Sequence, residues 1–182
     1  MTILDENNSL VLIIDFQEKL LNAIYNKKQT EKKALIMVKT ANILGIPIIV
    51  TEQYPKGLGE TIQEIKDAIG QNTEYYEKTS FSALDNSKIA DAIYKSNKKQ
   101  IVLFGIETHI CVSQTVNALM NEGYDVTVIS DASSSRTEAE HLAGLERIKE
   151  NGAHIITTEI AVFEWLKNAK HTKFKEVQNL IK

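Results

Sequence analysis

The sequence is poor in cysteine and in proline, and it lacks the pairs of cysteines whose disulfides stabilise small secreted proteins. Its 182 residues include one cysteine, Cys111, and two prolines. A single cysteine excludes an intramolecular disulfide, and a chain of this length buries a full core without a disulfide or a structural metal. The N-terminus shows no basic segment followed by an apolar run. We therefore expect one domain, residues 1–182, in the cytoplasm.

Long apolar runs and clusters of positive charge are also missing. The run IPIIV is far too short to cross a bilayer, which argues against a membrane protein. The formal net charge is -3, and no basic block is longer than a Lys-Lys pair, so nothing favours nucleic-acid binding. We expect a small-molecule substrate, no nucleic acid and no membrane.

What the sequence does contain is a regular alternation of short β-branched runs with stretches of helical spacing. This alternation predicts a parallel sheet buried on both faces. The predicted strands are residues 10–15, 46–51, 74–78, 100–105, 124–130 and 153–158. The predicted helices are residues 32–45, 60–70, 87–97, 111–123, 137–152, 160–167 and 173–181. Right-handed crossovers then favour an α/β, three-layer doubly wound (Rossmann-like) six-stranded parallel sheet, order 3-2-1-4-5-6, with helices on both faces.

Capping residues mark several helix ends. The predicted C-terminal caps are Gly45, Gly70, Gly123 and Gly152. In the segment SDASSSR, residues 130–136, the pattern indicates a helix start capped by Ser135 or Thr137.

The last two predicted helices pack on the sheet or on a partner subunit. The apolar residues Phe163, Trp165 and Leu166 need a surface to cover them, so we expect a homo-oligomer.

Three chemically capable side chains follow predicted strands. In a doubly wound sheet, ligands bind beyond the carboxyl ends of the strands where the strand order reverses. Asp15 ends the first strand, Lys78 ends the third, and Cys111 lies six residues beyond Gly105. Spacing leaves other interpretations open, with Asp15 as a helix cap and Lys78 as a solvated surface residue.

Cys111 also has two interpretations. Free cysteine is among the most buried residue types, and spacing alone favours a small core residue. Its place at the start of a helical pattern favours a nucleophile, because free backbone N–H groups there stabilise a thiolate and hold an oxyanion.

Metal and phosphate sites find little support. The four histidines, His109, His141, His154 and His171, show no zinc-site spacing. His109 is so close to Cys111 in sequence that the two side chains rarely point at one another, and we reject a Cys-His pair. The glycines of YPKGLGE match neither nucleotide-binding fingerprint. We expect no metal and no cofactor.

Five segments together resemble the isochorismatase-like cysteine hydrolase superfamily. They are LIIDFQ (12–17), TEQYPKGLG (51–59), EKTSFSAL (77–84), GIETHICVSQT (105–115) and SDASSSR (130–136). The resemblance covers nearly the whole chain. It is greatest to the branch of isochorismatase domain-containing proteins.

The resemblance implies a catalytic triad of Asp15, Lys78 and Cys111. In that mechanism Asp15 takes the thiol proton and later delivers it to the leaving group, while Cys111 forms a covalent thioester-type acyl-enzyme. Lys78 supplies positive charge that favours the thiolate and the carboxylate. Water then releases the product.

The resemblance also implies a cis peptide bond between Ile106 and Glu107. An oxyanion hole would then form from the backbone N–H groups of Glu107 and Cys111. A small, weakly charged substrate suits the pocket candidates, which by position are Gln17, Gln53, Tyr54, Phe81 and Leu84.

Departures from named members of the superfamily narrow the activity. Nicotinamidases carry metal-binding Asp and His residues after the second strand, where this chain has TEQYPKGLGETIQ. True isochorismatases cleave a vinyl ether without a cysteine nucleophile. We therefore expect a metal-independent cysteine hydrolase acting on a small amide, carbamoyl or related substrate, with C–N bonds as the target. The alternatives are a nicotinamidase-type or isochorismatase-type hydrolase, and a non-catalytic binding or scaffold protein. The acidic charge disfavours a nuclease.

Overall fold

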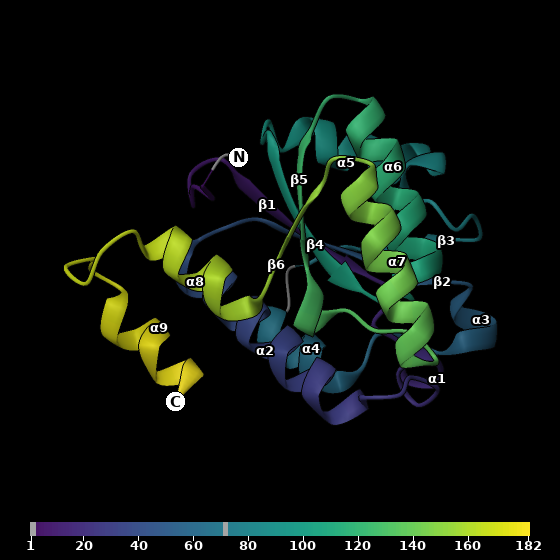
Figure 1. Ribbon diagram of the computed structural model, residues 1–182, viewed down its shortest axis with the longest axis horizontal. Helices are drawn as coiled ribbons and strands as arrows, with labels where there is room; N and C mark the ends of the chain where they lie inside the picture. The colour runs from purple at the N-terminus through teal and green to yellow at the C-terminus, as the bar shows by residue number, and fades with distance from the viewer. Residues whose placement is uncertain (1–2, 71–72) are drawn as a thin grey trace.

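A computed structural model describes residues 3–70 and 73–182 (Figure 1). At its centre six parallel strands form one sheet in the order β3-β2-β1-β4-β5-β6, which confirms the predicted fold class and strand order. The strands are β1 (Ser9–Ile14), β2 (Ile48–Gln53), β3 (Tyr75–Lys78), β4 (Gln100–Gly105), β5 (Asp125–Ile129) and β6 (His154–Ile156).

Helices cover both faces of this sheet. One face packs against α2 (Lys27–Leu44), α4 (Gln63–Ile69) and α8 (Thr158–Leu166). The other face packs against α5 (Ser87–Lys95), α6 (Ser113–Asn121) and α7 (Glu138–Glu150), as Figure 1 shows. Helix α9 (Phe174–Ile181) lies outside the first layer, against α2 and α8. The remaining short pieces are α1 (Glu18–Leu21), α3 (Pro55–Leu58), η1 (Ala83–Asp85), the π-helical turn η2 (Thr108–Val112) and η3 (Ser130–Ala132).

The alternation of side chains along β1 explains the three layers. Val11 and Ile13 belong to the core on the α2 face, and Leu10, Leu12 and Ile14 belong to the core on the α5–α7 face. All five are fully buried. Successive residues of a strand point to opposite faces, so a strand that is apolar throughout requires a helical layer on each side.

The two central strands, β1 and β4, separate at their carboxyl ends, where ligands are expected to bind. Ile14 of β1 pairs with Gly105 of β4 at the carboxyl ends of both strands. Gly105 has a φ of 149°, and a Cβ there would lie 2.0 Å from the Ile14 carbonyl oxygen. Only glycine therefore fits. Beyond this pair the two segments continue separately as Asp15 and Ile106, at the point where the strand order reverses.

Several predicted helix ends are confirmed, and one start differs. Thr137 caps α7 by accepting a hydrogen bond from the Glu140 N–H at 3.2 Å, and Gly45 ends α2 in a left-handed conformation. The helix predicted at 111–123 begins earlier, at Thr108, because the turn η2 precedes α6.

The chain itself covers part of the apolar surface of α8. Trp165 and Leu166 are buried within the chain itself, and the Trp165 indole N–H donates to the Ser9 hydroxyl at 2.9 Å. Of the two coverings expected for the last helices, the sheet or a partner subunit, these two residues have the first, because the chain's own core covers them. Phe163 remains 42% exposed, so the expectation of a homo-oligomer now rests on this part of the helix.

Within the described ranges, 3–70 and 73–182, no helix combines the length and the apolar character that crossing a bilayer requires.

Candidate active site

Asp15 directly follows β1 and is fully buried. Its φ of 51° is left-handed, which turns the chain away from the strand direction. The Thr51 hydroxyl donates to Asp15 Oδ1 at 2.6 Å, and the Asp15 N–H donates to the Thr51 carbonyl at 3.2 Å. The N-cap of α1 is Gln17, so Asp15 is not its cap. Its carboxylate is instead held at the edge of the sheet.

Lys78 ends β3, and its side chain is buried as completely as that of Asp15. Its Nζ lies 2.7 Å from Asp15 Oδ2. The ammonium also donates to Gln53 Oε1 at 2.7 Å and to the carbonyls of Ser80 and Phe81, both at 3.3 Å. Lys78 is therefore not a solvated surface lysine.

Cys111 lies in the turn η2 and packs into the core on the α5–α7 face, with 6% of its surface exposed. Burial, reinforced by the negative charge of Asp15, raises the pKa of the thiol to about 12, while the Lys78 ammonium opposes this rise. The ammonium thus acts in the expected direction, toward the thiolate, but burial has the larger effect on the thiol. The sulfur rests as a thiol beside a carboxylate.

The loop between β4 and Cys111 has the cis peptide bond that the resemblance implies, between Ile106 and Glu107. Glu107 is buried, and its Oε1 lies 2.9 Å from Nε of Arg136. The Thr108 N–H donates to the Ser134 carbonyl at 2.9 Å. The loop after β5 therefore holds this segment in place.

The segment SDASSSR makes two further contacts of this kind. The Ser133 hydroxyl accepts from the Gly105 N–H at 3.3 Å, and the Ser135 hydroxyl lies 2.9 Å from His109 Nδ1. His109 Nε2 lies 3.6 Å from Glu140 Oε2. The imidazole thus binds the loop and α7 rather than the thiol, which confirms the rejection of a Cys-His pair.

Helix α7 packs directly on η2. The Thr108 hydroxyl lies 2.9 Å from Nδ1 of His141, a buried histidine whose pKa is lowered by its burial. A Cβ on Gly144 would lie 2.8 Å from the His109 nitrogen, so the approach depends on the missing side chain.

Sequence reasoning missed Thr51 and Arg136 as parts of the site. The available signal was their position, because Thr51 pairs with Ile14, the residue before Asp15, and Arg136 lies in the segment that follows β5. Neither a threonine nor an arginine indicates a catalytic site by its residue type alone.

Two of the predicted pocket residues use their amides inside the protein. Gln17 is fully buried, with its Nε2 donating to the Gln53 carbonyl at 3.0 Å and its Oε1 accepting from the Gln53 N–H at 2.7 Å. Gln53 donates through Nε2 to the Thr79 carbonyl at 2.8 Å and accepts from Lys78. Both amides therefore face protein groups.

The other three pocket candidates present apolar surface near the same strand ends. Tyr54 and Phe81 are 55% and 52% exposed, and Leu84 packs partly against the core that contains Cys111.

The acidic side chain near the end of β2 makes a structural contact. Glu52 Oε1 accepts from both the N–H and the hydroxyl of Thr61, each at 2.7 Å. In the part of the chain that the structure describes, no group of three or more His, Cys, Asp or Glu residues is arranged to hold a metal ion.

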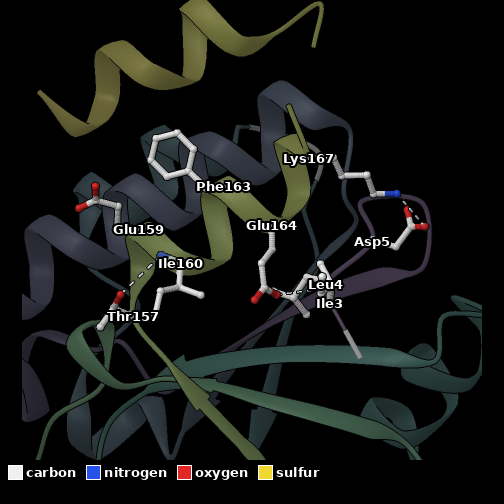
Figure 2. Close-up of a pocket in the computed structure, with 9 residues that line it drawn as sticks. All are labelled: Ile3, Leu4, Asp5, Thr157, Glu159, Ile160, Phe163, Glu164 and Lys167. Atoms are coloured by element: carbon white, nitrogen blue, oxygen red, sulfur yellow. Dashed lines mark hydrogen bonds and ion pairs between the residues drawn. The ribbon is translucent and has the colours of Figure 1, made fainter. Parts of the chain in front are cut away.

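An open groove of about 1120 Å³ lies elsewhere, along α8 (Figure 2). Its walls come from residues 3–5 and from α8, where Lys167 pairs with Asp5 at 3.1 Å and Glu164 accepts from the Leu4 N–H at 2.9 Å. The groove does not include Asp15, Lys78 or Cys111.

Comparison with known proteins gives a family from sequence and a matching fold from structure. The isochorismatase domain model matches residues 9–160. Over 178 residues the chain is 40% identical to isochorismatase family protein 1A of Dictyostelium discoideum, covering 96% of this chain and 86% of that protein. It is 39% identical over 178 residues to isochorismatase domain-containing protein 2 of Xenopus laevis, covering 98% and 85%.

Among solved structures, the structure of MAR1 ribonuclease from Caenorhabditis elegans superposes with a TM-score of 0.94 at 35% identity, covering 99% of this chain and 92% of that chain. The matched domain model and the identities to the two relatives indicate one family, and the structural match and the strand order are consistent with it. The chain therefore belongs to the isochorismatase family and has its hydrolase fold.

Proposed function

We propose that the chain is a cysteine hydrolase in which Asp15, Lys78 and Cys111 form a catalytic triad. The substrate would be a small amide, carbamoyl or related molecule. The observation that carries this proposal is the fully buried ion pair between Lys78 and Asp15, 2.7 Å long, whose two charges both act on the Cys111 thiol. Burying two charges costs several kcal/mol per ion, and such a pair beside a nucleophile of perturbed pKa is typical of a functional site.

The proposed chemistry follows from a protonated resting thiol. As the Cys111 sulfur bonds to the substrate's carbonyl carbon, the thiol proton passes to Asp15. Asp15 delivers this proton to the leaving nitrogen as the C–N bond breaks. Water then attacks the thioester carbon and gives a proton to Asp15, the C–S bond breaks, and the proton returns to the sulfur.

Around this centre we assign supporting roles. The backbone N–H groups of Glu107 and Cys111 would donate to the oxyanion. Tyr54, Phe81 and Leu84 would form the wall of the pocket, with Gln17 and Gln53 behind it. No step in this scheme uses a metal or a cofactor.

The test is mass spectrometry of the intact protein after exposure to a panel of amides, carbamoyl compounds and esters, with nicotinamide and a vinyl ether included. We expect an adduct on Cys111, and we expect Cys111→Ala to lower turnover by about 10⁴-fold or more. Ser113→Ala, a nearby change outside the triad, serves as the control. Wild-type turnover in Cys111→Ala would sink the proposal, and a complete lack of adducts and turnover would favour the non-catalytic binding protein.

RNA hydrolysis is a second candidate, because the solved structure of the 35% identical Caenorhabditis elegans protein is described as a ribonuclease. Against it stand the net charge of -3, which does not attract a phosphate backbone, and the absence of a carbonyl carbon at an RNA phosphate. A labelled RNA incubated with wild type and with Cys111→Ala separates the two functions. Cleavage that disappears in the variant would favour the nuclease.

A further inference from the structure

We propose that Gln53 is a positioning residue that holds the Lys78 ammonium against Asp15 and Cys111, rather than a residue that binds substrate. This inference rests on the proposed function, since it gives Gln53 a task within the proposed triad.

The sheet places the two side chains together. Gln53 and Lys78 are paired residues of β2 and β3, and paired residues of parallel strands point to the same face. Gln53 Oε1 accepts from Lys78 Nζ at 2.7 Å, the same distance that separates Nζ from the Asp15 carboxylate. Gln53 Nε2 donates to the Thr79 carbonyl at 2.8 Å, which orients the oxygen toward the ammonium.

The ammonium's hydrogen-bonding capacity is completely used. It has three N–H donors. One meets Asp15 and one meets Gln53, while the carbonyls of Ser80 and Phe81, both at 3.3 Å, share the third direction. Gln53 provides the closest contact other than the carboxylate, so its removal frees the ammonium to move.

The amide has an advantage over a carboxylate at this position. Asp15 already balances the single positive charge of Lys78, and a second carboxylate at 2.7 Å would compete for that charge. The attraction between the ammonium and a developing thiolate would then weaken, because a nearby negative charge disfavours a thiolate. A neutral acceptor fixes the position of the ammonium without this penalty.

Gln17 holds Gln53 in turn. The β1–β2 pairing ends at Ile14 and Thr51, two residues before Gln53. Beyond it, the Gln17 amide replaces the strand partner by bonding both the N–H and the carbonyl of Gln53. The backbone of Gln53 is thus fixed on the β1 side, where the strand pairing has ended, as the pairing with β3 fixes it on the other side.

The experiment measures how fast iodoacetamide alkylates Cys111 between pH 7 and pH 9 in wild type, Gln53→Met and Gln53→Glu. Both variants are expected to slow alkylation by about threefold or more at each pH, since a raised thiol pKa lowers the thiolate fraction more than it increases nucleophilicity. Gln63→Met, an exposed glutamine of α4, is the matched control and is expected to react like wild type.

If Gln53 had only a structural role, its substitution would not change the alkylation rate of Cys111. A decrease smaller than about threefold, or an increase, in both variants would therefore overturn the inference. Thermal denaturation of each variant shows that the measurement concerns folded protein. Should Gln53→Met not fold, Gln53→Glu, which keeps an oxygen acceptor, carries the test. Alkylation needs no turnover, so the result is independent of whether the hydrolase proposal survives its own test.

Discussion

At the scale of single residues, the two charges beside Cys111 affect its thiol in opposite directions. Asp15 raises the pKa and Lys78 lowers it, while burial makes the largest contribution. Because the pKa is about 12, the alkylation rate of wild type should increase about tenfold per pH unit from pH 7 to pH 10 without a plateau. A plateau below pH 10 would instead indicate an ordinary, solvated thiol.

We predict that substitutions of these two charges shift this rate with opposite signs. Asp15→Asn should speed alkylation at pH 8 by about threefold or more while it stops turnover, and Lys78→Met should slow alkylation by a similar factor. Alkylation rates and turnover of the two variants, measured side by side, check this.

Stability must be followed in the same two variants. Asparagine adopts left-handed backbone readily, so Asp15→Asn keeps the local conformation, but each variant leaves one buried charge without its partner at a cost of about 3–5 kcal/mol. Alkylation rates that change in the same direction in both variants would contradict the opposite effects of Asp15 and Lys78 on the thiol.

The sequence predicted these residues only in part. Asp15 and Lys78 could be placed at one edge of the sheet because the order of elements implies a parallel topology. Nothing in EYYEK shows that the lysine side chain turns inward, since that depends on acceptors from β1 and β2 and on the carbonyls of residues 80 and 81. The pKa of Cys111 also depends on burial, which spacing does not give.

At the scale of elements, the strands were predictable and the turn η2 was not. A strand such as β1, buried on both faces, is apolar from Leu10 to Ile14, and this pattern is local. The turn η2 is held by contacts from distant segments, the Ser134 carbonyl and the close approach of Gly144, so its own sequence carries little of the signal.

Gly144→Ala tests how strongly α7 determines the position of Cys111. Alanine is the better helix former by about 1 kcal/mol, so α7 alone would gain stability. The added Cβ would lie 2.8 Å from the His109 nitrogen, so η2 must shift. We predict a lower turnover number, a changed Cys111 alkylation rate and a net loss of about 1–3 kcal/mol in the free energy of unfolding.

The neighbouring exposed residue supplies the control for this prediction. Ala143→Gly weakens α7 by about 1 kcal/mol without adding atoms near η2, so turnover should stay at the wild-type level. A more stable and fully active Gly144→Ala would show that the contact is not restrictive.

At the scale of the whole molecule, helix α8 near the C-terminus is joined to the first strand through Trp165. Trp165 is fully buried and donates to Ser9 at the start of β1, whereas Phe163 on the same helix is 42% exposed. We predict that Trp165→Ala lowers the free energy of unfolding by about 3–5 kcal/mol and that Phe163→Ala lowers it by less than about 1 kcal/mol. Urea denaturation measures both, and equal losses would contradict this account of α8.

The backbone at Asp15 restricts position 15 more than charge alone does. A glutamate would supply the same carboxylate, yet a φ of 51° is adopted most readily by glycine, asparagine and aspartate. Of these three only aspartate ionises. A library that randomises position 15 would therefore be filtered twice, once by conformation and once by proton transfer, and aspartate alone would pass both filters.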